Sequence, residues 1–185
     1  MPYTPFHLGF AWPVFLLKKR KLHFMCLSWG AMIPDIELVF LMLLGVPHAD
    51  ARGAMHSLLG ALTIDILIVL IIAYFLVPPI GRWFKKHIKH DWHIFAGIDV
   101  TRAPTNPAWA LLSAGIGTVS HVILDIFTHD FNPVFWPSIQ NVSWLLFGVS
   151  LESMLVFTVP LAILFLVTLT LFWTRKPGKR PAKFN

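Results

Sequence analysis

The chain has 185 residues, of which 56% are hydrophobic and only 13% are charged, and its mean hydropathy is +0.69. Soluble domains carry about 25% charged residues, so this composition excludes an ordinary soluble domain and predicts an integral membrane protein. The single cysteine, Cys26, excludes an internal disulfide and any paired-cysteine metal or redox motif.

Five apolar segments follow one another along the chain and predict an all-α, polytopic membrane helix bundle that forms a single domain, residues 1–185. They cover residues 5–17, about 22–45, 56–77, 107 to about 128, and about 146–173. The first segment is shorter than the roughly 20 residues of a full span, so we expect a half-span or a tilted span with a kink at Pro13. The third segment is expected to stop at Pro78 and Pro79.

Lysine and arginine are concentrated in three stretches. If the five segments cross the membrane in alternation, all three stretches lie on the same side. Residues 18–21, residues 82–102 and the basic tail 174–185 hold four, five and five of the 15 basic residues, and Arg52 is left on the other side. Because cytoplasmic loops carry the excess of Lys and Arg, we expect the N-terminus outside and the C-terminus in the cytoplasm, in a prokaryotic inner membrane. Anionic lipid head groups are the expected partners of the basic loops. No nucleic-acid partner is expected, and self-association stays open.

Ionisable side chains recur at one level in the outer half of the predicted membrane. Such groups are costly inside a bilayer, so a chain retains them where they pair or act. Counting the helical rise from the cytoplasmic basic stretches places members of four segments in this layer. The members are His7, Asp35, His56, His121, Asp125 and His129.

Two other carboxylates are not expected to join this layer. Asp65 lies about 180° around a helix from His56, so we expect it to be a hydrogen-bonded structural group or a contact with another helix. Glu37 lies about 200° from Asp35, so at most one of these two is expected to point inward, and we favour Asp35.

The fourth segment carries the clearest candidate for metal binding. His121, Asp125 and His129 are four residues apart and form one stripe on a helix. An i, i+4 His/Asp pair presents two ligands on one face, as in helical zinc sites. Histidine and aspartate suit Zn²⁺ and, with more carboxylates, Mn²⁺ or Fe²⁺. We therefore expect a divalent metal cofactor, which also neutralises buried carboxylates.

Four stretches together resemble a known family. They are MPYTPFHLG at residues 1–9, PDIE at 34–37, AMHSLLGAL at 54–62 and GTVSHVILDIFTH at 117–129. They are similar to the membrane-bound metal-dependent hydrolase family, the uncharacterised YdjM-like proteins, and the resemblance covers residues 1 to about 133. This family is in turn distantly similar to zinc-dependent phospholipases C, whose helical sites use HxxxD pairs.

The resemblance implies a set of metal ligands in this chain: His7, Asp35, His56, His121 and Asp125. It implies that His129 is a further ligand or a proton shuttle. The stretch ARGAMHS, residues 51–57, departs from the fuller HRxxTHS of YdjM-like proteins because the first histidine is missing. A complete two-metal site is therefore not implied.

The expected function is a membrane-embedded metal-dependent hydrolase that acts at the outer membrane interface on an amphiphilic, phospholipid-like ester. Asp35 or Asp125 would act as ligand or base and His129 as acid, which makes these three the catalytic candidates. Two alternatives stay open. One is a non-catalytic membrane subunit with a structural polar or metal cluster. The other is a haem-binding redox anchor that uses His56 and His121.

Overall fold

The structure is a computed structural model that describes residues 7–18, 21–47, 51–87, 98–138, 140–144 and 150–174. Every regular element in these ranges is helical, as the sequence predicted. The α-helices are α1 (Leu8–Lys18), α2 (Phe24–Gly30), α3 (Pro34–Leu43), α4 (Leu58–Leu62), α5 (Ile64–Ile71), α6 (Val77–His87), α7 (Pro107–Ile126) and α8 (Ser150–Thr174). A 3-10 turn, η3 (Ala54–His56), precedes α4, and a π-helical turn, η4 (Ile72–Leu76), joins α5 to α6.

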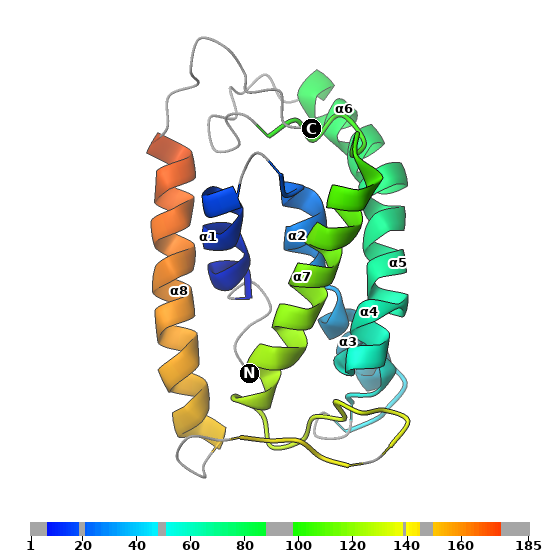
Figure 1. The fold of residues 1–185 in the computed structure, drawn as a ribbon, viewed down its shortest axis with the longest axis vertical. Coiled ribbons are helices and arrows are strands. Elements are labelled where there is room, and N and C mark those ends of the chain that lie inside the picture. The colour runs from blue at the N-terminus through cyan, green and yellow to red at the C-terminus, as the bar shows by residue number, and fades with distance from the viewer. Residues whose placement is uncertain are drawn as a thin grey trace.

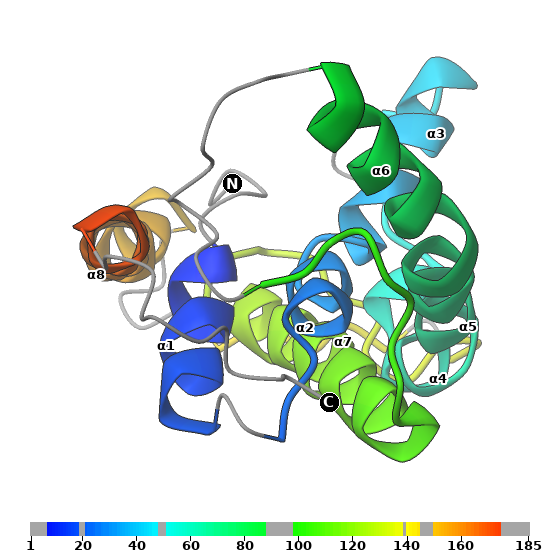
Figure 2. The same cartoon turned by 90° about the horizontal axis from the view of Figure 1, so that it is seen from above.

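Helix α7 holds the bundle together. Together with α2 it lies between the α1–α8 pair and helices α4 and α5 (Figures 1 and 2). The Asn106 side chain accepts a hydrogen bond from the Trp109 backbone N–H at the start of α7, and Pro107 occupies the first turn, where no N–H is needed. From this start α7 runs for 20 residues through the centre of the molecule.

Helices α2 and α7 pack closely because glycines meet at their crossing. A Cβ on Gly117 would lie 2.5 Å from a carbonyl oxygen of α2, and a Cβ on Gly30 would lie 2.6 Å from the Ala114 carbonyl oxygen. Small residues of this kind allow membrane helices to bring their backbones together. The crossing places the end of α2 beside the C-terminal half of α7.

The second apolar segment is a bent pair of helices. Helices α2 and α3 meet at an angle of 43°. Pro34 opens α3, and because it has no backbone N–H it cannot continue the hydrogen-bond ladder of α2. Asp35 and Glu37 therefore fall in the first turn of α3, where the helix dipole favours carboxylates.

The third segment differs from its prediction at both ends. His56 lies in η3, ahead of a break at Thr63, and the long helix begins at Ile64. The expectation that Pro78 and Pro79 end this helix is wrong, because the helical stretch continues to His87. Both prolines fall in the first turn of α6, directly after the π-helical turn, where missing N–H groups are tolerated.

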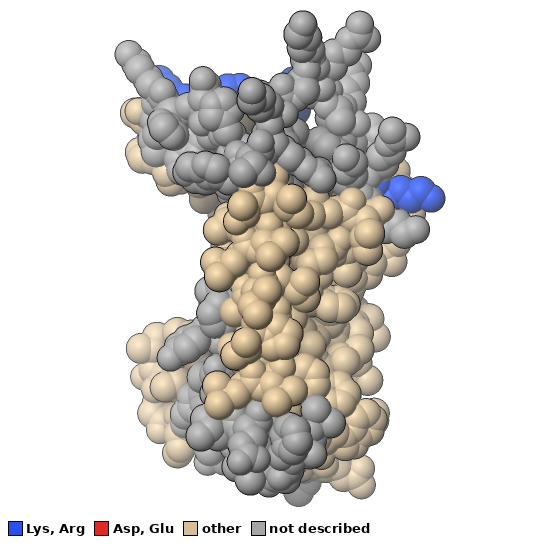
Figure 3. Space-filling view, turned by 90° about the vertical axis from the view of Figure 1, so that its left-hand side faces the viewer, with Lys and Arg blue, Asp and Glu red and all other residues tan. Residues whose placement is uncertain are grey.

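Two described helical stretches, Ile64–His87 and Pro107–Ile126, are long and apolar enough to cross a membrane. The bent α2–α3 pair makes a third if it counts as one span. Helix α1 continues through Pro13 and has 11 residues, about 16 Å, against a hydrocarbon core of roughly 30 Å. Seen from the α8 side, the described surface between the two ends carries no charged residue, with Lys and Arg near the upper end (Figure 3). Most of the predicted basic tail, residues 175–185, lies outside the described residues.

Candidate metal centre

Seven ionisable side chains meet in a buried cluster near the C-terminal end of α7, the lower end in Figure 1. As whole residues, none of them is more than 8% exposed. We call this set the polar cluster: His7, Asp35, Arg52, His56, His121, Asp125 and His129. The structure thus brings together all the residues that the sequence placed in one layer, and adds an arginine.

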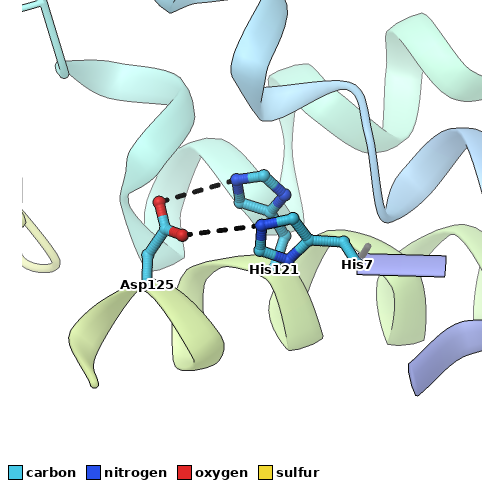
Figure 4. A group of neighbouring side chains, drawn as sticks. All are labelled: His7, His121 and Asp125. Carbon is cyan, nitrogen blue, oxygen red and sulfur yellow. Dashed lines mark ion pairs between the residues drawn. The ribbon is translucent and has the colours of Figure 1, made fainter. Parts of the chain in front are cut away.

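Asp125 lies at the centre of the polar cluster, and its two carboxylate oxygens face different partners. Its Oδ2 is 3.6 Å from His121 Nε2 and 3.9 Å from His56 Nε2. Its Oδ1 is 3.7 Å from His7 Nε2 and 3.3 Å from His129 Nδ1. The rings of His7 and His121 stack with centroids 4.0 Å apart, and each directs a nitrogen at the carboxylate (Figure 4).

Asp35 closes the other side of the same space. Its Oδ1 lies 3.5 Å from His121 Nε2 and 3.7 Å from His56 Nε2. Two imidazoles and two carboxylates, from α3, η3 and α7, are therefore neighbours. His121 belongs to two overlapping sets of three side chains whose ligand atoms lie within 4.8 Å of one another: Asp35, His56 and His121, and His7, His121 and Asp125.

The far edges of both imidazoles are fixed by hydrogen bonds. His121 Nδ1 donates to the Ala31 carbonyl oxygen at 2.9 Å. His56 Nδ1 donates to Glu37 Oε2 at 3.1 Å. Because a carbonyl oxygen can only accept, the proton of His121 sits on Nδ1, and in the neutral ring the Nε2 lone pair points at the carboxylates. Outer partners of this kind orient and strengthen metal-binding histidines.

The distances inside the polar cluster fit ligands that share an ion. The Nε2 atoms of His56 and His121 lie 3.5 to 3.9 Å from the Asp35 and Asp125 oxygens. Charge-assisted hydrogen bonds between such groups are shorter, roughly 2.7–2.9 Å. Two ligands of a tetrahedral zinc ion are about 3.4 Å apart, because each lies about 2.0–2.2 Å from the metal. The donor set, two nitrogens and two carboxylate oxygens, also suits zinc.

The hydrogen bonds of the polar cluster also indicate that several of its atoms lack a partner. Among the described residues, His56 Nε2, His121 Nε2 and both Asp125 oxygens are buried and have no hydrogen-bond partner. Buried polar atoms are normally paired, so a group of unpaired atoms around one point needs an explanation. A cation bound beside both Nε2 atoms would satisfy them together with the Asp125 Oδ2 that faces them.

The charges point in the same direction. Asp35, Glu37 and Asp125 contribute three carboxylates, whereas Arg52 is the one guanidinium among the described residues that contacts any of them. With neutral imidazoles, two negative charges remain, which equals the charge of one divalent cation. An uncompensated excess of this size is unfavourable in a buried site.

The segment that follows α7 fixes the end of the helix. The Asn132 side-chain amide donates to the backbone carbonyls of Asp125 and His129, and Ser143 Oγ donates to the His129 carbonyl. These bonds satisfy carbonyls that a helix end leaves free. His129 Nδ1 is thereby held between the Asp125 carboxylate and the Thr128 hydroxyl, 2.9 Å away.

The expectation that at most one of Asp35 and Glu37 points inward is wrong. Glu37 also contacts the polar cluster, because His56 lies between the two acids and presents one nitrogen to each. Glu37 Oε2 accepts two further bonds, from the N–H groups of Gly53 and Met55. Asp65 is fully buried, but neither of its oxygens has a hydrogen-bond partner among the described residues. Of the two roles expected for it, the hydrogen-bonded group is excluded and a contact with another helix stays open.

Sequence reasoning did not assign a role to Arg52. Its Nε lies 3.5 Å from Asp125 Oδ2. The available signal was that Arg52 is the one basic residue outside the three basic stretches, four positions before His56. An isolated arginine outside the basic stretches is a candidate for the site.

Comparison with known proteins identifies a family and no function. Neither the curated proteins nor the solved structures contain a match to the chain. One family model matches residues 1–183, nearly the whole chain. The chain belongs to this family, which is described as a domain of unknown function, DUF4184.

Proposed function

We propose that the protein is a membrane-embedded, metal-dependent hydrolase that cleaves an amphiphilic ester at the outer membrane interface. The observation that carries the proposal is the set of unpaired donors around one point. Asp35, His56, His121 and Asp125 would hold one divalent ion, with Zn²⁺ favoured over Mn²⁺ and Fe²⁺ by the two imidazoles. His7 lies on the other oxygen of Asp125, where it is a further ligand or a support for that carboxylate.

A divalent ion at this position would activate water and polarise the scissile ester bond. The residues of the chain have separable tasks around it. Asp35 and Asp125 both direct a carboxylate oxygen at His121 Nε2. His129 stands beside Asp125 Oδ1, and its buried Nε2 has no hydrogen-bond partner among the described residues. That nitrogen can carry a proton to a leaving group, so His129 is the candidate general acid.

The surface supports a location in the lipid bilayer. Large apolar side chains are widely exposed, among them Leu43 at 81% and Phe75 at 71%. Such surfaces mark contact with a membrane or a partner. From the basic stretches of the sequence we propose that the C-terminus lies in the cytoplasm and the N-terminus outside, with five segments in a prokaryotic inner membrane and the polar cluster in its outer half. A substrate would then reach the site from the lipid.

One observation favours a non-catalytic alternative. The Arg52 guanidinium contacts Asp125, so a metal-free cluster would already contain one internal ion pair, which joins the loop before η3 to α7. The haem alternative has weaker support. The His56 and His121 rings are 5.6 Å apart, and carboxylates occupy the space that their Nε2 atoms face.

Metal analysis of the purified protein tests the proposal. We expect about one zinc ion per chain after expression with zinc and removal of weakly bound metal. His121→Ala should lose this ion, because it removes a central donor. His87→Ala is the matched control, since His87 is exposed at the end of α6 and its Nδ1 bonds the Trp83 carbonyl oxygen of the same helix. Equal zinc in the wild type and His121→Ala, or none in either, would overturn the assignment.

A second measurement separates catalysis from structure. His129→Gln should keep the zinc, since His129 lies beside the Asp125 oxygen that faces away from His56 and His121. Hydrolysis of a lipid-like ester should fall by roughly 10²- to 10⁴-fold, the usual contribution of a general acid. Zinc binding in the wild type without hydrolysis of any carboxylic or phosphate ester would support the non-catalytic alternative.

A further inference from the structure

Arg52 is buried beside the candidate metal donors and has unused hydrogen-bond donors. Its side chain is 3% exposed, and its Nε lies 3.5 Å from Asp125 Oδ2. Neither Nε nor Nη2 has a hydrogen-bond partner among the described residues. A guanidinium is always charged and carries five N–H donors, so leaving several of them unpaired in a buried site is costly.

The position of Arg52 excludes it as a metal ligand and points to an anion. A guanidinium has no lone pair to offer a metal. Yet the oxygen that it faces, Asp125 Oδ2, is also the oxygen that faces His56 and His121. Arg52 is therefore directed at the space of the ion itself. The Asp125 carboxylate lies between a cation there and the guanidinium, but it leaves the buried Nε and Nη2 donors without a hydrogen-bond partner among the described residues. The oxygens of a bound anion can accept from these donors.

The backbone around Arg52 is fixed in advance. Ala51 is fully buried, and the N–H of Gly53 donates to Glu37 Oε2 at 2.9 Å. Glu37 also holds His56. The same carboxylate thus positions a candidate ligand and the loop that carries Arg52, which is the kind of support that a binding residue needs.

We propose that Arg52 binds the phosphoryl group of the substrate. The inference rests on the proposed hydrolase and narrows its substrate class to phosphate esters. A neutral carboxylic ester offers a single carbonyl oxygen to a guanidinium, whereas several phosphate oxygens match its planar fork and can accept from the unpaired Nε and Nη2 donors. The phosphoryl group would lie between Arg52 and the ion. Its ester bond would then be next to the carboxylates of Asp35 and Asp125.

Binding of inorganic phosphate tests this role without needing turnover. The protein is purified in detergent and loaded with zinc, free zinc is removed, and phosphate is titrated in by calorimetry. Arg52→Gln should keep the zinc and bind phosphate about 10- to 100-fold more weakly, the value of a hydrogen bond to a charged group. Arg52→Lys should fall between the two, because it keeps the charge and loses the fork.

Arg102→Gln is the matched control, since Arg102 is 80% exposed and precedes the opposite end of α7. It should bind phosphate like the wild type. Two further titrations identify the source of the group. Glycerol 3-phosphate represents a soluble phosphoester, and phosphatidic acid in phosphatidylcholine nanodiscs represents a lipid head group. The ligand that binds more tightly identifies the substrate class, provided that Arg52→Gln lowers the affinity for it.

The outcomes separate this inference from the hydrolase itself. Zinc-loaded wild type that ignores phosphate, or an Arg52→Gln variant that binds it equally well, overturns the role of Arg52 and leaves the metal site standing. Loss of zinc in both Arg52 variants would show that Arg52 only supports Asp125, which also overturns it. A wild type that binds no zinc removes the hydrolase proposal and this inference with it.

Discussion

Helix α7 contains two groups of buried polar side chains that differ in how their hydrogen bonds are satisfied. In its middle, the hydroxyls of Ser113, Thr118 and Ser120 donate to backbone carbonyl oxygens at 2.6 to 2.8 Å. Directly after them along the helix, His121 Nε2 and both Asp125 oxygens have no hydrogen-bond partner among the described residues. Along the same helix, buried polar groups with satisfied hydrogen bonds are therefore followed by buried polar groups that lack a partner.

The difference separates polar groups that serve packing from polar groups that are placed to bind something. A hydroxyl bonded to a carbonyl lets helices approach without an unpaired dipole. The His121 imidazole differs, because its Nδ1 is hydrogen-bonded while its Nε2 faces two carboxylates and has no hydrogen-bond partner among the described residues. If this distinction is correct, substitutions in the two groups should have different consequences, which the following predictions describe from the largest effect to the smallest.

Asp125→Asn should have the largest effect. The amide keeps the shape of the side chain but removes a negative charge from the centre of the polar cluster, so zinc content should fall to near zero. Metal analysis of the purified variant measures this directly. Asp99→Asn, at an exposed carboxylate in the loop before α7, is the control and should retain wild-type zinc. Retention of zinc by both variants would remove Asp125 from the ligand set.

Glu37→Gln should weaken zinc binding by about 10- to 100-fold, the usual effect of changing an outer partner of a ligating histidine. The glutamine loses the charge that aligns His56 and the loop at Gly53. Competition with a chelator of known affinity measures the change. An affinity equal to that of the wild type would mean that His56 is oriented without this carboxylate.

Gly117→Ala should destabilise the fold and disturb the metal site together. Its new methyl group would lie 2.5 Å from the Leu27 carbonyl oxygen, so α2 must shift, at about 1–3 kcal/mol. That shift would also move the Ala31 carbonyl that orients His121. Thermal unfolding in detergent provides the measurement.

Gly115→Ala is the control for this crossing. A Cβ there meets only Ile66 Cδ1, at an ordinary 3.4 Å. It should leave both the melting temperature and the zinc content close to those of the wild type. Equal behaviour of the two alanine variants would show that the close approach of α2 and α7 does not position the site.

Thr118→Val should have the smallest effect. It removes one buried hydrogen bond, to the Ala61 carbonyl oxygen, while keeping the shape of the side chain. We expect a loss of about 1 kcal/mol in stability and no change in zinc affinity. A clear loss of zinc would contradict the division of α7 into a packing region and a binding region.

Helical spacing allows part of the site to be predicted from the sequence. A separation of four residues places His121 and Asp125 on one face of α7 wherever the helix lies, and a helical rise counted from a basic stretch places Asp35 at the same depth. The all-helical class follows from the long apolar segments for the same reason. These inferences use only local geometry, which a sequence carries.

The remaining contacts depend on how separate pieces of backbone meet. Glu37 reaches His56 because residues 51–56 fold across the start of α3, and no count of angles along α3 contains that information. Arg52 enters the site on the same loop. The prolines at 78 and 79 fail to end a helix because a π-helical turn precedes them. In each case tertiary structure overrides a local rule.

Crystallographic anomalous scattering at the zinc edge, recorded from the purified wild-type protein, tests the metal site most directly. We expect one strong peak about 2.0–2.2 Å from His56 Nε2, His121 Nε2 and carboxylate oxygens of Asp35 and Asp125. Well-ordered side chains in the same positions with no peak among them, or a peak that touches none of these four residues, would contradict a metal centre at the end of α7.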